Sequence, residues 1–99
     1  MGMNRPSFRT GHNIIAIVGT AEQCTAAVVP QGIRVVYRSR STNAGLLFIG
    51  YNKADAETNN FSIIPAGSVG LLVDDVSDMW IDAASAGDII EWCYEVPIE

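Results

Sequence analysis

The chain has 99 residues and a mass of 10.6 kDa, enough for one domain with one thin hydrophobic core. Because 48% of the residues are hydrophobic and only 17% are charged, the composition excludes extensive disorder. The net charge of −5 and the pI near 4.6 argue against nucleic acid as a partner, since phosphate contacts require a basic surface.

The first thirteen residues show no period of 2 or 3.6 and contain two glycines and a proline. We expect residues 1–13 to form an extended arm and residues 14–99 to form one domain. The arm lacks the apolar stretch of a signal peptide, and no run in the chain approaches the roughly 20 apolar residues of a membrane span. We therefore expect a protein made in the cytoplasm, with no membrane partner. The arm residues expected to contact a partner are Arg5, Phe8, Arg9 and His12.

After the arm, short runs of β-branched and aromatic residues follow one another, each closed by turn residues. Apolar and polar side chains alternate most cleanly in 33–39 and 89–96, as in strands with one buried face. The run 46–51 is apolar on both sides, which indicates a strand covered by a second sheet and by a neighbouring subunit. Eight strands are predicted, over residues 14–18, 23–29, 33–39, 46–51, 61–64, 69–73, 79–83 and 89–96.

Turn residues between these runs support an all-β fold. The segments 29–32 and 64–67 carry Pro at the second and Gly at the fourth position, as a type I turn prefers. The polar stretch 52–60 is the longest connection and predicts an exposed tip. Because helical periodicity is nowhere sustained, we predict an antiparallel two-sheet β-sandwich, jelly-roll-like, with about eight short strands. A five- or six-stranded barrel with some runs unpaired is the alternative.

Charge is divided unevenly along the chain. Residues 1–53 contain six basic residues and one acidic residue, whereas residues 54–99 contain ten acidic residues and no basic one. Such asymmetry indicates two oppositely charged faces, or a basic segment of one copy that meets an acidic surface of another. The simpler alternative is that folding interleaves the two halves and pairs their charges.

No combination of residues indicates catalysis or a cofactor. His12 is the only histidine and lies in the predicted arm, which disfavours a nucleophile–histidine pair. Cys24 and Cys93 have no metal-ligand spacing, and we expect free thiols, although a disulfide stays open if their strands are neighbours. The carboxylates of Asp74, Asp75 and Asp78 lack the pattern of a calcium loop and are explained by a turn. We therefore predict a protein that is not an enzyme and binds no metal.

Several large apolar residues exceed the needs of a thin core. Trp80 is flanked by Met79 and Ile81, so that one face of this strand is unusually apolar for solvent. Self-association would cover it, and the residues expected at such an interface are Phe48, Tyr51, Met79 and Trp80. In a sugar-binding module, Trp80 or Tyr51 would instead form an exposed aromatic platform.

The second half of the chain resembles small virion proteins of tailed bacteriophages. The resemblance covers residues 46–96 and begins with Leu47-Phe48-Ile49-Gly50, a polar loop, and the turn Ile64-Pro65-Ala66-Gly67-Ser68. An acidic strand, Leu72-Val73-Asp74-Asp75-Val76-Ser77-Asp78-Met79-Trp80-Ile81, then leads through Ala83–Gly87 into the last strand. These motifs are structural turns and specify no catalytic site.

The resemblance implies a β-sandwich that acts as a capsid cement or decoration protein. It also implies a location on the capsid surface of the virion, the major capsid protein as partner, and a small homo-oligomer, with a trimer favoured over a dimer. Two alternatives stay open: a module that binds glycans or host surfaces, and a component of the phage tail or neck.

Overall fold

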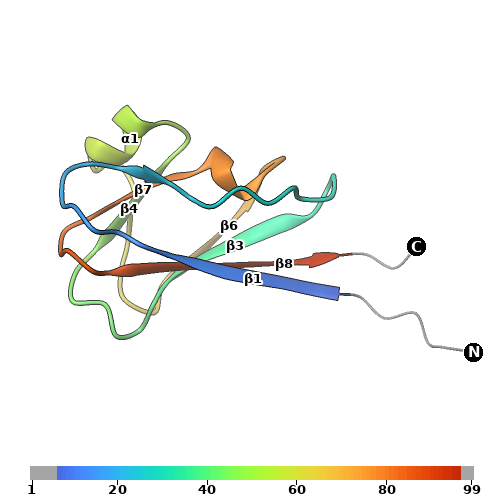
Figure 1. Ribbon diagram of the computed structural model, residues 1–99, viewed down its shortest axis with the longest axis horizontal. Coiled ribbons are helices and arrows are strands. Elements are labelled where there is room, and N and C mark those ends of the chain that lie inside the picture. Colours follow the sequence, from blue (N-terminus) through green and yellow to red (C-terminus); the bar gives the residue numbers. More distant parts are fainter. Residues whose placement is uncertain (1–6, 97–99) are drawn as a thin grey trace, which may run out of the picture.

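The computed structural model describes residues 7–96, which form two antiparallel sheets of four strands each and little helix (Figure 1). This confirms the predicted all-β, sandwich-like fold, with two sheets in place of a closed barrel. The strands are β1 (Ser7–Ile14), β2 (Glu22–Gln23), β3 (Arg34–Ser39), β4 (Leu47–Gly50), β5 (Ser62–Ile63), β6 (Ser68–Leu72), β7 (Trp80–Ala83) and β8 (Ile89–Val96). The helices are α1 (Lys53–Glu57) and the 3-10 turn η1 (Val76–Asp78).

The strands divide into sheet A, in the order β1-β8-β3-β6, and sheet B, in the order β2-β7-β4-β5. All pairs are antiparallel, and the longest pair joins β1 to β8 from Ser7 opposite Val96 to Ile14 opposite Ile89. Figure 1 shows β1 and β8 side by side along the long axis of the molecule. Sheet A therefore brings the first and last described strands together.

The core lies between the sheets and follows the alternation read from the sequence. In β3, Val35 and Tyr37 are fully buried, and in β8 the buried positions are Ile90, Trp92 and Tyr94. Sheet B contributes, among others, Leu47, Ile49, Ile81 and Ala83. The two cleanest alternating runs thus place their apolar side chains in the core, as a half-buried strand requires.

The predicted arm is wrong for residues 7–13, because these residues form most of β1 and pair with β8. Their inner face carries no large apolar side chain, which concealed the strand from a periodicity argument. Instead, the indole of Trp92 lies over Gly11, where an added Cβ would come within 2.2 Å of Trp92 Cζ2. The rest of the predicted arm, residues 1–6, lies outside the described residues.

The next two predicted strands are also displaced. Residues 15–18 are not a strand. Of the run 23–29, only Gln23, the second residue of β2, and Val28, in an isolated bridge with Asp75, pair with another strand or segment. The segment 24–29 nevertheless covers the core. The Tyr94 hydroxyl donates to the Val28 carbonyl at 3.0 Å, and the Val29 N–H donates to the Asp74 carbonyl at 3.0 Å.

The predicted exposed tip, 52–60, contains helix α1. Asn52 caps this helix, since its side chain accepts a hydrogen bond from the Asp55 N–H at 2.8 Å. Five residues are too few for a helix that stands alone, and packing on β4 and β7 holds α1 in place. Ala56 is fully buried in this contact.

Both proline turns form, but with a different geometry from the predicted type I. In the first, the Ile33 N–H donates to the Pro30 carbonyl at 3.2 Å, so the turn lies one residue later, with Gly32 at φ +83°. In the second, the Gly67 N–H donates to the Ile64 carbonyl at 2.7 Å, and Ala66 has φ +69°. A positive φ at the third turn residue is the mark of a type II turn.

Candidate functional site

The outer face of sheet A carries several exposed apolar side chains. Side chains at alternate positions point away from the core, and the register places Phe8 and Ile14 of β1, Cys93 of β8 and Val36 of β3 on this face. The exposed fractions are 64% for Phe8, 54% for Ile14 and 38% for Val36. Leu72 at the end of β6, 51% exposed, lies opposite Arg34 on the same face.

The outer face of sheet B is different, because the chain itself covers it. An added Cβ on Gly50 would lie 2.7 Å from the backbone nitrogen of Ala56, which shows how closely α1 approaches β4. The carboxylate of Asp82, on the same face, accepts a hydrogen bond from the Gly19 N–H at 2.9 Å. The Ala21 N–H donates to Glu57 of α1 at 2.8 Å. Helix α1 and the loop 15–21 thus form a third layer.

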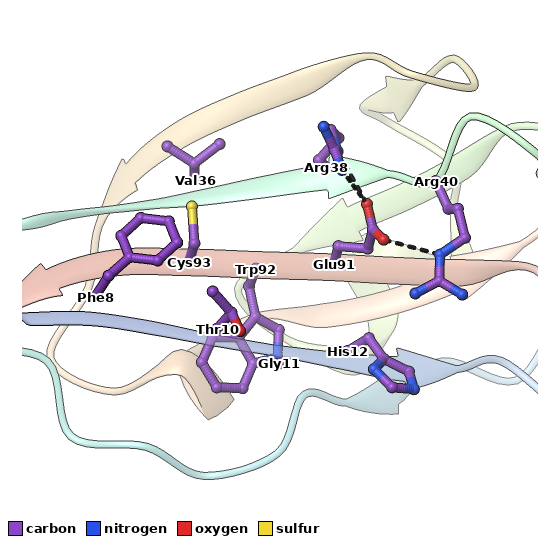
Figure 2. Close-up of a pocket in the computed structure, with 10 residues that line it drawn as sticks. All are labelled: Phe8, Thr10, Gly11, His12, Val36, Arg38, Arg40, Glu91, Trp92 and Cys93. Carbon is purple, nitrogen blue, oxygen red and sulfur yellow. Dashed lines mark hydrogen bonds and ion pairs between the residues drawn. The ribbon is translucent and has the colours of Figure 1, made fainter.

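A shallow groove of about 380 Å³ crosses β1, β8 and β3 on the open face of sheet A (Figure 2). Figure 2 shows Phe8, Val36 and Cys93 gathered at one end of this groove. Arg40 and His12 lie toward the other end, so the groove is apolar at one end and charged at the other.

At the charged end of the groove, Glu91 binds two arginine side chains. Its Oε1 accepts hydrogen bonds from Arg38 at 2.9 Å and 2.7 Å, and its Oε2 accepts one from Arg40 Nε at 2.8 Å. The hydrogen bonds from Arg38 and then Arg40 hold the pKa of the Glu91 carboxyl below its usual value. Since Arg38 and Arg40 come from the basic half of the chain and Glu91 from the acidic half, folding pairs part of the charge asymmetry.

A second groove of about 450 Å³ lies where β4 and the residues just before β5 approach β6 of sheet A. Its aromatic residues are Tyr51, 61% exposed, and Phe61, 52% exposed. The side chains of Asp55 and Asn60 add polar groups at its rim. An aromatic surface beside a carboxylate and an amide is the chemistry that binds small polar ligands.

The predicted arm residues fall in three places. Phe8 and His12 line the groove on sheet A. Arg9 is exposed but lies opposite Tyr94 on the inner face of β1, away from the groove. Arg5 lies outside the described residues.

The predicted oligomer-interface residues are divided as well. Tyr51 is exposed, whereas Phe48 and Trp80 are only partly accessible on the face of sheet B that α1 approaches. Met79 is 3% exposed and belongs to the core, so it offers almost no surface to a second copy, and we remove it from the interface.

The acidic cluster is structural, as the sequence predicted. Asp75 Oδ1 accepts from the Ser77 N–H at 2.9 Å and from Ala27 at 2.8 Å, while Asp78 accepts from the Asp74 N–H at 3.0 Å. The bonds from Ser77 and Ala27 lower the pKa of the Asp75 carboxyl. Within residues 7–96, no group of three or more acidic, histidine or cysteine residues is placed to hold a metal ion.

Both cysteines are free thiols, which confirms the expectation. Cys24 is buried, and burial raises its pKa to about 12. Cys93 is partly exposed and lines the groove on sheet A. Two thiols in such different environments differ in reactivity, because the thiolate is the nucleophile.

Comparisons with known proteins return no relative. No family model, no curated protein and no solved structure matches the chain. In the described part of the chain, no helix has the length and apolar character to cross a membrane.

Sequence reasoning missed most residues of the groove on sheet A, namely Thr10, Val36, Arg38, Arg40, Glu91 and Cys93. The signal was present, because the two runs with the cleanest alternation contribute four of these residues at outward positions. What the sequence did not reveal is that β1 lies beside β8 and supplies Phe8 and Thr10.

Proposed function

We propose that this chain is a structural protein that binds another protein through the open face of sheet A, and that it serves as a cement or decoration protein of a bacteriophage capsid. The observation that carries the proposal is the contrast between the two outer faces. The chain covers sheet B itself, but it leaves Phe8, Val36 and Leu72 exposed on sheet A. An apolar face that the monomer leaves open is typical of an interaction surface.

The order of the strands supports the jelly-roll form of the sandwich, which we include in the proposal. Within the sheets, β1 pairs with β8, β2 with β7, β3 with β6 and β4 with β5. Such nested pairs arise when one long hairpin, with β4 and β5 at its tip, is rolled up into two sheets. Jelly rolls occur in viral capsid proteins and in lectins, so the topology favours these two classes without choosing between them.

The resemblance of residues 46–96 to small phage virion proteins favours the capsid. In this proposal, the partner is the major capsid protein, and its surface meets both ends of the groove. The apolar end contributes by burial, while Arg40 and His12 contact acidic groups of the partner. The protein carries out no chemistry in this role and needs no cofactor.

A co-sedimentation assay tests the proposal with capsids of the cognate phage prepared without this chain. We expect the chain to saturate such capsids, and Val36→Lys to abolish binding because it places a charge in the apolar end of the groove. Val28→Lys is the matched control, since Val28 is 79% exposed and lies on the segment that covers the core from the opposite layer. Failure of the unmodified chain to bind, or equal loss in both variants, would contradict the proposal.

The two thiols provide a second readout of the same surface. We expect maleimide to label Cys93 faster than Cys24 in the free protein, because Cys24 is buried and its pKa is raised. Bound capsid is expected to protect Cys93 and to leave the slow labelling of Cys24 unchanged. Unaltered labelling of Cys93 on saturated capsids would place the interface elsewhere on the protein.

The number of copies per particle distinguishes a capsid protein from a tail or neck component.

The groove beside Tyr51 favours a second candidate, a module that binds glycans or host surfaces. Tyr51 and Phe61 present aromatic faces next to Asp55 and Asn60. If this function holds, a glycan array detects a ligand, and Tyr51→Ala removes binding while Val36→Lys does not. An unresponsive array eliminates the candidate.

A further inference from the structure

One edge of sheet A is formed by β1, the strand beyond β8 in the order β1-β8-β3-β6, and within residues 7–96 no strand pairs with its outer side. Figure 2 shows β1, β8 and β3 side by side on this face. An eight-residue edge strand is long, and its unpaired backbone groups form a template for another strand. Natural edges are usually shielded by several charges, by proline or by a covering loop. This edge has no proline and a single arginine, Arg9, and Ser7, Phe8, Arg9 and Thr10 are all exposed.

The hydrogen-bond pattern determines which residues face outward at this edge. The Ile15 N–H donates to the Asp88 carbonyl at 2.9 Å, directly after the ladder between β1 and β8. Because backbone groups alternate in an antiparallel strand, residues 9, 11 and 13 bond to β8. The N–H and C=O groups of Phe8, Thr10, His12 and Ile14 then point away from the sheet, and none of them pairs with another described residue.

We propose that β1 pairs with β1 of a second copy about a two-fold axis at Gly11, which joins two A sheets into one eight-stranded sheet. In this register Phe8 lies opposite Ile14 of the second copy and Thr10 lies opposite His12, so about eight backbone hydrogen bonds form across the axis. Phe8 and Ile14, 64% and 54% exposed in one chain, then cover each other as an aromatic and β-branched pair.

Other two-fold registers fit the edge less well. An axis at Thr10 leaves Ile14 opposite a residue beyond the start of β1, and an axis at His12 leaves Phe8 opposite Ala16, beyond its end. Only the axis at Gly11 uses all four outward residues. The charges on β1 are also compatible with this axis. β1 has no carboxylate that could pair with Arg9, so the two Arg9 side chains must stay apart. The axis at Gly11 places them roughly 13 Å apart, beyond the screening length of about 8 Å.

The inference goes beyond the proposed capsid role, because it names a second copy as the partner of the edge and needs no capsid. It also differs from the interface predicted from the sequence, which lies on other strands. The joined sheet presents two copies of the groove on one continuous face. Purified protein alone tests it, so its failure leaves the capsid proposal standing.

Sedimentation of the full chain over a range of concentrations is the first test. We expect a reversible dimer with twice the mass of the 10.6 kDa chain, insensitive to salt. Thr10→Pro removes an outward N–H and keeps the bonds to β8, and we expect it to weaken the dimer about a hundredfold. The matched control is Ser68→Pro, which makes the same change at the outward position of the other edge, β6, and leaves the dimer intact.

Disulfide formation between introduced cysteines shows which residues of the two β1 strands lie opposite each other. This test does not depend on whether a proline variant folds. The background is Cys93→Ser, since Cys93 lies opposite Thr10 in the same chain and would react with a cysteine there. With oxidised glutathione, a mixture of Thr10→Cys and His12→Cys chains is expected to give mainly the mixed disulfide, because hydrogen-bonded partners lie about 5.5 Å apart. Each variant alone leaves its cysteines about 8 Å apart, too far for a bridge.

Three results would overturn the inference. The first is a monomer, or an assembly larger than a dimer, at every concentration. The second is a dimer that Ser68→Pro disrupts and Thr10→Pro does not, which would place the contact at β6. The third is a disulfide that forms faster in Thr10→Cys alone than in the mixture, which would place the axis at Thr10.

Discussion

The two sheets share one core but differ in what lies on their outer faces. On sheet B, α1 approaches Gly50, and the Gly19 N–H of the loop 15–21 donates to Asp82, so the chain itself covers part of this face. On sheet A, the side chains of Phe8, Val36 and Leu72 meet solvent, beside the pair of arginines that hold Glu91.

This difference separates residues that serve the fold from residues that serve binding. A small chain has few residues outside its sheets with which to cover them. In this chain, the segment 52–60 and the loop 15–21 cover one sheet only. Apolar residues left on the other sheet do not stabilise the monomer by burial. The same substitution is therefore expected to have different consequences on the two faces.

Glycine substitutions give the largest expected contrast. Gly50→Ala would place its Cβ 2.7 Å from the Ala56 nitrogen and should destabilise the protein by about 2–3 kcal/mol, because α1 must move away. Gly70→Ala makes the same change on the outer side of β6, where the nearest atom is Arg34 Cδ at 3.8 Å, and should change stability by less than about 0.5 kcal/mol. Urea unfolding of both variants measures this contrast, and equal losses would show that α1 does not cover sheet B in solution.

Buried carboxylates give the next contrast. Asp82, only 3% exposed, accepts hydrogen bonds from the Gly19 and Ala83 N–H groups at 2.9 Å and 2.8 Å. Asp82→Ala leaves these donors unpaired and should cost about 1–2 kcal/mol in thermal or urea unfolding. Glu95→Ala, at an exposed position of β8, is the control and should change little. Asp88 is buried as well, and its carboxylate accepts hydrogen bonds from the Ala44 and Gly45 N–H groups.

Six of the eight strands could be predicted from the sequence because their signals are local. Alternation in 33–39 and 89–96, and short apolar runs between turns, placed β3 to β8 within a few residues. β1 was missed because Gly11 is covered by Trp92, a contact between residues far apart in the chain. α1 was missed because its five residues depend on packing against Gly50, which no local pattern records.

The candidate site was predictable only in part for the same reason. Phe8 and His12 were identified as partner-binding residues, but on an arm and not on a strand. Their neighbours Val36, Glu91 and Cys93 join them only through the pairing of β1 with β8 and of β8 with β3. Which side chains share a surface depends on how the strands pair, and a single sequence contains little information about pairing between distant strands.

The smallest expected effect is the pH dependence that Glu91 contributes on the open face. Its pKa is lowered in the folded protein by hydrogen bonds from Arg38 and Arg40, so the folded state binds this proton less tightly than the unfolded chain does. The stabilisation is therefore present above the unfolded pKa, near 4.5, and is lost as pH falls through the lower folded value. Because the three side chains are partly exposed, the total is about 1 kcal/mol or less. Glu91→Gln should flatten the decline in unfolding free energy below pH 4.5, whereas Glu95→Gln should keep it. An identical decline in Glu91→Gln and the unmodified protein would show that the arginines do not hold Glu91 in solution, and the charged end of the groove would then be free to bind a partner's acidic groups directly.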